Sequence, residues 1–242
     1  MKQIKARGLV LREYEAGESD KRLLIFCKEH GRLMVYARGA RKPVSKFMAA
    51  AQLFTYADFI LAKGPGFYSL AQAQVIESFY PLREDYDRLM AAHLVAEACE
   101  KTLWDNIESD ELLKLALKSL AILAKGVTPG QAASVFLLRF FDVHGLRPQT
   151  DSCVLCNAPA TGAKMVLCAE GLVCDAHKPA TYQPLSYAAI AAMQHILTND
   201  LAKAFQFTVA DAVLVELQKA VKLLWKCHFE WELKTLTTSL SL

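Results

Sequence analysis

The stretch KRLLIFCKEHGRLMVYARGA, residues 21–40, decides how the first part of the chain folds. It holds two short apolar runs, Lys21–Cys27 and Arg32–Ala40, separated by the tight turn His30-Gly31. Two runs of this length joined by a glycine turn are typical of a pair of neighbouring β-strands.

Three further segments of strand character surround this pair. They are Ala6–Tyr14 before it, and Leu53–Leu61 and Phe67–Ile76 after it. Five short strands separated by turn residues predict a small barrel or sandwich. A five-stranded OB-type β-barrel over residues 1–80 is one solution of that size.

After Pro81 the apolar residues recur at helical spacing. The predicted helices are Leu89–Trp104, Asp110–Lys125, a helix from Pro129 to Gly145, Ser186–Leu197 and Val209–Trp225. For the third of these, the sequence predicts Thr128 as the N-cap with Gln131 in the capping-box position, and Gly145 as the stop. We therefore expect an α+β multidomain protein, with a barrel over 1–80 and a helical domain over 81–150 and 181–242.

The insert at residues 151–180 carries the most specific motif in the chain. Cys153-Val-Leu-Cys156 is followed, after seventeen residues, by Cys174-Asp-Ala-His177. Each turn presents two ligands to one ion, so the pair predicts a closed Cys3His shell for one structural Zn²⁺. Gly162 and Gly171 flank the apolar run Met165–Leu167, which favours a short zinc-ribbon-like hairpin carrying the two turns.

Other interpretations of the cysteines remain open at this stage. Cys168 could replace His177 as the fourth ligand, or the thiols could be free, or the first pair could be a redox motif. A disulfide framework is not expected, because the count of seven is odd and the N-terminus does not look like an export signal. The remaining three cysteines, Cys27, Cys99 and Cys227, are expected in the core.

Positive charge is concentrated near the N-terminus. The net charge is +3, but residues 1–80 hold 13 Lys and Arg against 7 Asp and Glu, or 13 − 7 = +6. Five cations and no acid lie between His30 and Ala57: Arg32, Arg38, Arg41, Lys42 and Lys46. Glycine and proline in the run Arg38–Pro43 place these cations on a loop at the barrel rim. We expect them to bind nucleic-acid phosphates, with a solvated surface loop as the alternative.

Aromatic residues near this segment could stack on bases, as they do in OB barrels that hold single strands. The candidates are Tyr36, Phe47, Phe54, Tyr56, Phe67 and Tyr68. Most of them are expected in the barrel core, because strand aromatics are more often buried than exposed.

Motifs for catalysis are missing from the sequence. It lacks a P-loop, a dinucleotide fingerprint, a zinc-protease helix and a nucleophile elbow, and its six histidines form no catalytic set. No stretch is long and apolar enough to span a bilayer. The residues therefore point to no catalytic site, and no membrane partner is expected.

Three groups of residues resemble the RecO family of bacterial DNA-repair and recombination-mediator proteins. They are Glu18-Ser19-Asp20-Lys21, the run from Gly31-Arg32 to Arg38-Gly39-Ala40-Arg41-Lys42, and Phe136–Arg139 through Gly145–Pro148 into Cys153-Val-Leu-Cys156. The order of the parts is similar as well, and the resemblance covers nearly the whole chain.

The resemblance implies an OB domain that binds single- and double-stranded DNA and a helical domain with a zinc insert. It implies annealing of complementary strands, and help in loading a RecA-type recombinase onto DNA coated by single-strand-binding protein, together with RecR. The implied DNA contacts are Arg38, Arg41, Lys42 and Lys46, with Arg32 as a further candidate. The resemblance also implies a protein that is not an enzyme and is cytoplasmic and nucleoid-associated. The alternative is a zinc-ribbon regulatory protein whose basic loop binds an acidic protein.

The C-terminal tail of single-strand-binding protein, which is acidic and apolar, is expected to dock on the helical domain. The candidate contact residues for this tail are the aromatic segment Phe136–Phe141, Arg139, and the lysines Lys219, Lys222 and Lys226. The alternative for the aromatic residues is that they belong to the core.

Overall fold

The computed structural model describes residues 2–105, 107–161 and 164–239. It divides into two compact units, Met1–Ala124 and Lys125–Leu242. Each unit is described by itself. The boundary lies between the second and third long helices, so the first two helices belong to the unit that contains the barrel.

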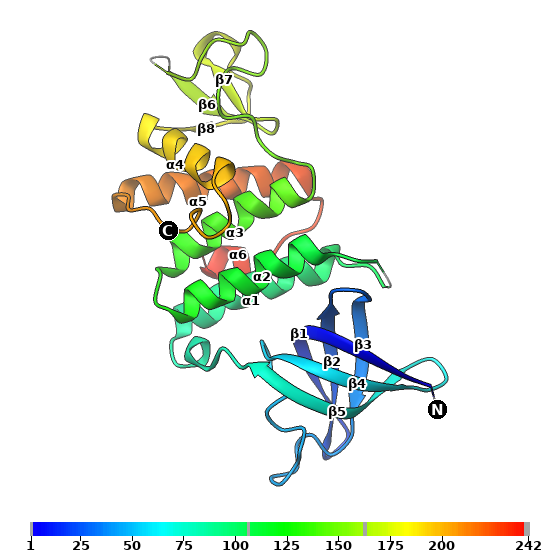
Figure 1. Ribbon diagram of the computed structural model, residues 1–242. Helices are drawn as coiled ribbons and strands as arrows, with labels where there is room; N and C mark the ends of the chain where they lie inside the picture. The colour runs from blue at the N-terminus through cyan, green and yellow to red at the C-terminus, as the bar shows by residue number, and fades with distance from the viewer. Residues whose placement is uncertain (1, 106, 162–163, 240–242) are drawn as a thin grey trace. The chain divides into compact units, whose positions relative to one another are not determined.

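The five predicted strands form a closed barrel (Figure 1). They are β1 Gln3–Ala16, β2 Asp20–Cys27, β3 Gly31–Ala37, β4 Tyr56–Lys63 and β5 Tyr68–Glu77. The strand order is β1-β2-β3-β5-β4, with β1 pairing β4 to close the barrel and β3 pairing β5 in parallel at Val35 and Tyr68. A five-stranded barrel of this kind has the OB fold, as expected.

The barrel interior follows from alternation along the strands. Small and branched side chains from every strand, together with one phenylalanine, fill it. They are Ala6, Val10, Leu23, Ile25, Cys27, Leu33, Val35, Ala37, Ala57, Phe59, Leu61 and Leu70. Their neighbours point to the other face of each strand, because successive residues of a strand alternate in direction.

The connection from β3 to β4 is longer than the sequence predicts. β3 ends at Ala37 and β4 begins at Tyr56. The late start of β4 follows from Phe54, because its left-handed backbone conformation, with φ of 64°, does not fit a strand. Its buried ring packs edge-on against His93, with centroids 5.3 Å apart. Phe47 and Ala51 from the same connection join the barrel core. The segment 38–55 is therefore a packed loop.

Two helices complete the first unit, α1 Tyr86–Thr102 and α2 Asp110–Ala124, after the short 3₁₀ turn η1 Tyr80–Arg83. The Asp85 side chain caps α1 by accepting the Arg88 N–H at 2.8 Å. α1 packs on α2 and on β1. This cover explains why apolar side chains such as Leu9 and Phe26 are buried outside the barrel interior.

The second unit is built from α3 Pro129–Val143, α4 Tyr187–Thr198, α5 Asp211–His228 and the short α6 Lys234–Ser239, which the sequence did not predict. α3 packs on α4 and α5. Thr128 occupies the N-cap position as predicted, but its side chain makes no cap hydrogen bond. The Gln131 amide instead donates to the carbonyls of Phe205 and Phe207, at 3.3 and 3.1 Å. Gly145 ends the helix with φ of +72°, as predicted.

The insert between α3 and α4 folds as a three-stranded sheet (Figure 1). Its strands are β6 Met165–Leu167, β7 Leu172–Cys174 and β8 Gln183–Pro184, in the order β7-β6-β8, and a 3₁₀ turn η2 Asp175–His177 follows β7. Gly162 lies outside the described residues. The insert is tied to the helices by Gln194 Nε2, which donates to the Thr150 carbonyl at 2.7 Å.

None of the described helices is long and apolar enough to cross a membrane.

Candidate nucleic-acid interface and metal centre

The basic loop is anchored at its start by Asp20, the first residue of β2. The Asp20 carboxylate accepts the backbone N–H of Gly39 at 2.7 Å and the hydroxyl of Tyr36 at 2.9 Å. The Gly39 N–H and, after it, the Tyr36 hydroxyl lower the pKa of Asp20. The Arg41 N–H also donates to the Ser19 carbonyl at 2.9 Å. The β1–β2 turn therefore holds the loop that carries the cations.

Four of the five predicted cations lie on this loop. Arg38, Arg41, Lys42 and Lys46 are all exposed. Arg41 is partly neutralised, because its guanidinium lies 3.0 Å from Glu15 and donates to the Gly17 carbonyl at 3.3 Å. The Lys46 ammonium lies 4.9 Å from the centroid of the Phe47 ring.

Arg32 is separated from this group. It lies near the start of β3, whereas Arg38 follows its end, so the two are about 20 Å apart along the strand. Arg32 Nε donates to Asp105 at 2.9 Å. The five cations that are grouped in the sequence are therefore separated in the structure. Four of them lie together on the loop, and Arg32 is paired with Asp105 elsewhere on the barrel.

The aromatic candidates divide into buried and exposed rings. Phe47 and Phe54 belong to the core, whereas Phe67 is 47% exposed in the β4–β5 loop. Tyr36, Tyr56 and Tyr68 are half-buried. Tyr36 points away from the barrel interior, because its neighbours Val35 and Ala37 face inward.

Two further residues beside Tyr36 were missed by the sequence analysis. Tyr14 on β1 is directly opposite Arg22 on β2, and Arg22 is directly opposite Tyr36 on β3. Cross-strand partners lie on the same face of a sheet. The signal for this arrangement is the strand register, which the sequence does not display.

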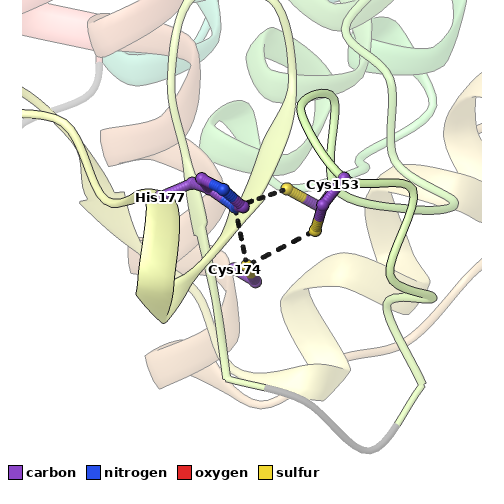
Figure 2. Close-up of side chains that lie close together, drawn as sticks. Cys153, Cys174 and His177 are labelled. Atoms are coloured by element: carbon purple, nitrogen blue, oxygen red, sulfur yellow. Dashed lines mark hydrogen bonds between the residues drawn. The ribbon is translucent and has the colours of Figure 1, made fainter.

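The second candidate site is a cluster of three cysteines and one histidine in the insert. The ligand atoms of Cys153, Cys156, Cys174 and His177 all lie within 4.8 Å of one another. Figure 2 shows Cys153, Cys174 and His177 pointing toward a common centre. The first two cysteines come from the turn after α3, and the other two residues come from the end of β7 and from η2.

The distances in this cluster suit a small tetrahedral ion. Cys156 Sγ and Cys174 Sγ are 3.8 Å apart, and His177 Nδ1 is 3.2 Å from Cys174 Sγ and 3.8 Å from Cys153 Sγ. A tetrahedron with metal–sulfur bonds of about 2.3 Å has sulfur–sulfur edges of about 3.8 Å. The four residues can therefore hold a metal ion between them.

The backbone around Cys153 favours its thiolate. Burial raises the pKa of the Cys153 thiol, but N–H groups of Cys174, Cys156 and Leu155 point at its sulfur and lower the pKa to about 6. At Cys156 the Ala158 N–H acts in the same sense, yet the thiols of Cys153 and Cys174 raise the pKa overall. Thiolates that crowd one another in this way favour a bound cation, which offsets their repulsion.

The other cysteines lie outside this cluster. Cys168, the alternative ligand, is buried and donates to the Gly171 carbonyl at 3.1 Å. Cys27 and Cys99 are buried as expected, but Cys227 is exposed near the end of α5, so its expected place in the core is wrong.

The aromatic segment of α3 is core. Phe136, Phe140 and Phe141 are fully buried, and Phe140 packs on Trp225 with ring centroids 5.4 Å apart. Arg139 donates to the carbonyls of Leu197 and Asn199, at 3.0 and 3.1 Å. These residues therefore hold the helices together and do not line an exposed pocket. Of the three lysines on α5, Lys219 and Lys226 are exposed and Lys222 is half-buried.

The fold and the two sites together define an OB-barrel protein with a basic loop and a helical unit that carries a Cys3His insert. Residues 1–79 match the family "Recombination protein O N terminal", and residues 83–237 match "Recombination protein O C terminal". The chain therefore belongs to the RecO family.

Its relatives cover most of its length. The chain is 33% identical over 227 residues to "DNA repair protein RecO" of Acetivibrio thermocellus. The matched stretch covers 90% of this chain and 89% of that protein. A protein of the same name from Desulfitobacterium hafniense is 33% identical over 205 residues, or 82% of this chain and 75% of the relative. A protein of the same name from Thermoanaerobacter is 28% identical over 240 residues, which are 97% of this chain and 96% of that relative.

Proposed function

We propose that this chain is a non-enzymatic recombination mediator in DNA repair. It binds single- and double-stranded DNA, anneals complementary strands, and helps to load a RecA-type recombinase onto DNA coated by single-strand-binding protein. The observation that carries the proposal is the loop at the end of β3, where Arg38, Lys42 and Lys46 are exposed on an anchored segment of an OB barrel. Family membership supports the same function. Binding to chromosomal DNA would place the protein on the nucleoid, in the cytoplasm.

The loop acts by neutralising phosphates. Lysine and arginine contacts to phosphates release condensed counterions and carry no sequence information, so binding is tight at low salt and similar for all sequences. Neutralised strands repel one another less, which brings complementary single strands together. The OB barrel supplies a rigid scaffold from which the loop projects.

The decisive experiment is an annealing assay with complementary oligonucleotides, run with and without single-strand-binding protein. The expected result is faster annealing in both conditions, with binding that weakens steeply as salt rises. Binding to an acidic protein but not to DNA would favour the zinc-ribbon regulatory alternative. Magnesium-dependent cleavage of the DNA would instead make the chain an enzyme.

Partner proteins are part of this proposal. The family resemblance implies work with RecR and contact with the acidic tail of single-strand-binding protein. The exposed lysines Lys219 and Lys226 on α5 offer charge for that tail, whereas the α3 aromatics are not accessible to it. Titration of a labelled tail peptide against the full chain and against the full-length variant Lys219→Glu/Lys226→Glu tests the contact. Equal affinities would place the receptor elsewhere.

The ion in the Cys3His cluster is proposed to be one structural Zn²⁺. Three thiolates and one imidazole fill all four positions of a tetrahedral shell, which is the donor set of structural zinc sites. The ion's role is then to hold the two turns of the insert together. DNA chemistry at the metal is not part of the proposal, because the four protein ligands occupy the whole shell.

A further inference from the structure

We propose that the outer face of the barrel carries a base-stacking platform for single-stranded DNA, formed by Tyr14, Arg22 and Tyr36. This inference rests on the proposed DNA binding. It adds contacts to the bases to the phosphate contacts that the basic loop makes. It assigns to the barrel a means of telling single strands from duplex, which the basic loop by itself does not have.

The strand register carries the argument. Arg22 is directly opposite Tyr14 on one side and Tyr36 on the other. Leu23 and Val35, the neighbours of Arg22 and Tyr36, fill the barrel interior, so Arg22 and Tyr36 point outward. Tyr14 shares this face because it pairs directly with Arg22. The result is a row of ring, guanidinium and ring across three strands.

The three side chains are accessible and close together. Arg22 is exposed, and the two tyrosines are half-buried. The Arg22 guanidinium carbon lies 6.0 Å from the centroid of the Tyr14 ring. The two rings are separated by one strand, or about 10 Å, so each can receive a different base. Both aromatic rings and guanidinium planes stack on bases, whatever the sequence.

The platform leads into the basic loop. Tyr36 precedes Arg38 by two residues, and its hydroxyl shares the Asp20 carboxylate with the Gly39 N–H. On the other side, Tyr14 and Arg41 line one hollow of about 370 Å³. A strand whose bases lie on the platform can therefore place its phosphates beside the loop cations.

Two of the acidic residues next to the platform are paired with cations. Glu13 and Glu15 also line the hollow. Glu13 lies 2.6 Å from the Lys21 ammonium, and Glu15 lies 3.0 Å from the Arg41 guanidinium. Their repulsion of a DNA backbone is thereby reduced. The Asp20 carboxylate beside Tyr36 is held by the Gly39 N–H and the Tyr36 hydroxyl.

The experiment compares three DNA probes of equal phosphate number. They are an oligo-dT, an abasic oligonucleotide and a duplex, and their affinities for the full chain are measured by fluorescence anisotropy. The test variant is Tyr14→Leu/Tyr36→Leu. One control, Tyr14→Phe/Tyr36→Phe, keeps both rings and, like the Leu pair, lacks the Tyr36 hydroxyl that bonds to Asp20. The other, Tyr86→Leu, removes a tyrosine that is 66% exposed and belongs to α1, not to a barrel strand.

The unmodified chain is expected to bind oligo-dT more tightly than the abasic probe. Relative to the Phe pair, the Leu pair should weaken oligo-dT binding by about tenfold for each ring lost, with equal affinity for the abasic probe and the duplex and an equal salt slope on oligo-dT. Tyr86→Leu should bind all three probes as the unmodified chain does. Any loss in the Phe pair should be the same on all three probes, because it comes from the Tyr36 bond to Asp20 that anchors the loop. A partial effect of either single Leu substitution relative to its Phe counterpart, confined to oligo-dT, supports the platform in the same way.

Three results would overturn the platform. They are equal binding of oligo-dT and abasic probe by the unmodified chain, equal loss on all three probes in the Leu variants, and a loss in the Phe pair as large as in the Leu pair. Any of these leaves the proposed function standing, as long as the chain binds DNA. If the unmodified chain binds none of the probes, the proposed function fails as well.

Discussion

Asp20 and Gly39 are joined by a hydrogen bond of 2.7 Å from the Gly39 backbone N–H to the Asp20 carboxylate. The bond connects the β1–β2 turn with the start of the basic loop, two elements that are nineteen residues apart in the sequence. Gly39 has φ of 66°, a conformation that glycine adopts without strain and that turns the loop away from β3. The Glu18–Lys21 motif thus acts as a clamp on the residues that carry positive charge.

Replacing Asp20 should loosen this clamp. Asp20→Ala removes the acceptor for both Gly39 and Tyr36, whereas Asp20→Asn keeps an oxygen but loses the charge. We expect DNA affinity and resistance of residues 38–46 to proteolysis to fall in the order unmodified, Asn, Ala. Limited proteolysis followed by mass spectrometry locates the cleavage. Equal protection in all three proteins would contradict the clamp.

The clamp also predicts a pH dependence. Because the folded-state pKa of Asp20 is lowered, its contribution to stability is present above the unfolded value, about 3.9, and is lost as pH falls through the folded pKa. The difference in melting temperature between the unmodified chain and Asp20→Asn should therefore be largest near neutral pH and shrink below about pH 4. A difference that grew on acidification would show that Asp20 is not stabilising as a carboxylate.

Removing the loop charges should weaken binding to every DNA sequence alike. For Arg38→Gln/Lys42→Gln/Lys46→Gln we expect the slope of log affinity against log salt to become shallower by about 2 on single strands, because each phosphate contact contributes about 0.7. Two oligonucleotides of unrelated sequence, titrated at several salt concentrations, measure the slope. The matched control is Arg32→Gln, since Arg32 is already paired with Asp105. If Arg32→Gln reduced the salt slope as much as the triple variant does, the loop cations would have no special role in DNA binding.

The spacing of residues in the sequence was sufficient to predict a feature when its residues lie close together along the chain. The two ligand pairs of the insert are each three residues apart, so a single turn brings each pair together, and the sequence predicted the cluster with His177 in place of Cys168. The barrel was predictable for a similar reason, since strand length and turn residues are local features.

Long-range pairing is what the sequence did not display. Tyr14, Arg22 and Tyr36 meet only through the register of three strands. Arg32 and Arg38 appeared as one cluster because they are close in sequence, but an extended strand separates them. Phe54 has a residue type that favours strands, and its contact with His93 in α1 prevails over that preference.

Loss of the ion should unfold the insert. Because binding to a structural site contributes to folding free energy, a chelator or Cys153→Ser/Cys174→Ser should lower the melting temperature of the second unit. Native mass spectrometry should find one zinc in the unmodified chain and none in the double variant. Cys168→Ser is the control, because Cys168 bonds to Gly171 outside the cluster, and it should keep the ion. Loss of zinc in this control with retention in the double variant would reverse the ligand assignment.

Gly171 should tolerate no side chain. Its φ of +141° is open only to glycine, and a Cβ atom there would lie 2.3 Å from the Gln149 carbonyl oxygen and 2.5 Å from the Gln149 nitrogen. Both are backbone atoms that make hydrogen bonds to the insert. The Gln149 N–H donates to the Glu170 carbonyl at 3.0 Å, and the Leu172 N–H donates to the Gln149 carbonyl at 2.8 Å. The atoms therefore cannot move aside without breaking the link between the insert and the segment after α3. We expect Gly171→Ala to cost about 3 kcal/mol or more of unfolding free energy.

Gly17 provides the comparison for this substitution. It also has a positive φ, +64°, but nothing lies within 4 Å of a Cβ built there. Gly17→Ala should therefore cost only the left-handed conformation, about 1 kcal/mol. Denaturant unfolding of both variants measures the difference, and zinc content should fall only for Gly171→Ala, because Cys174 follows it on β7. Equal costs at the two glycines would mean that the insert shifts freely against residue 149, and the crowding at Gly171 would then have no structural consequence.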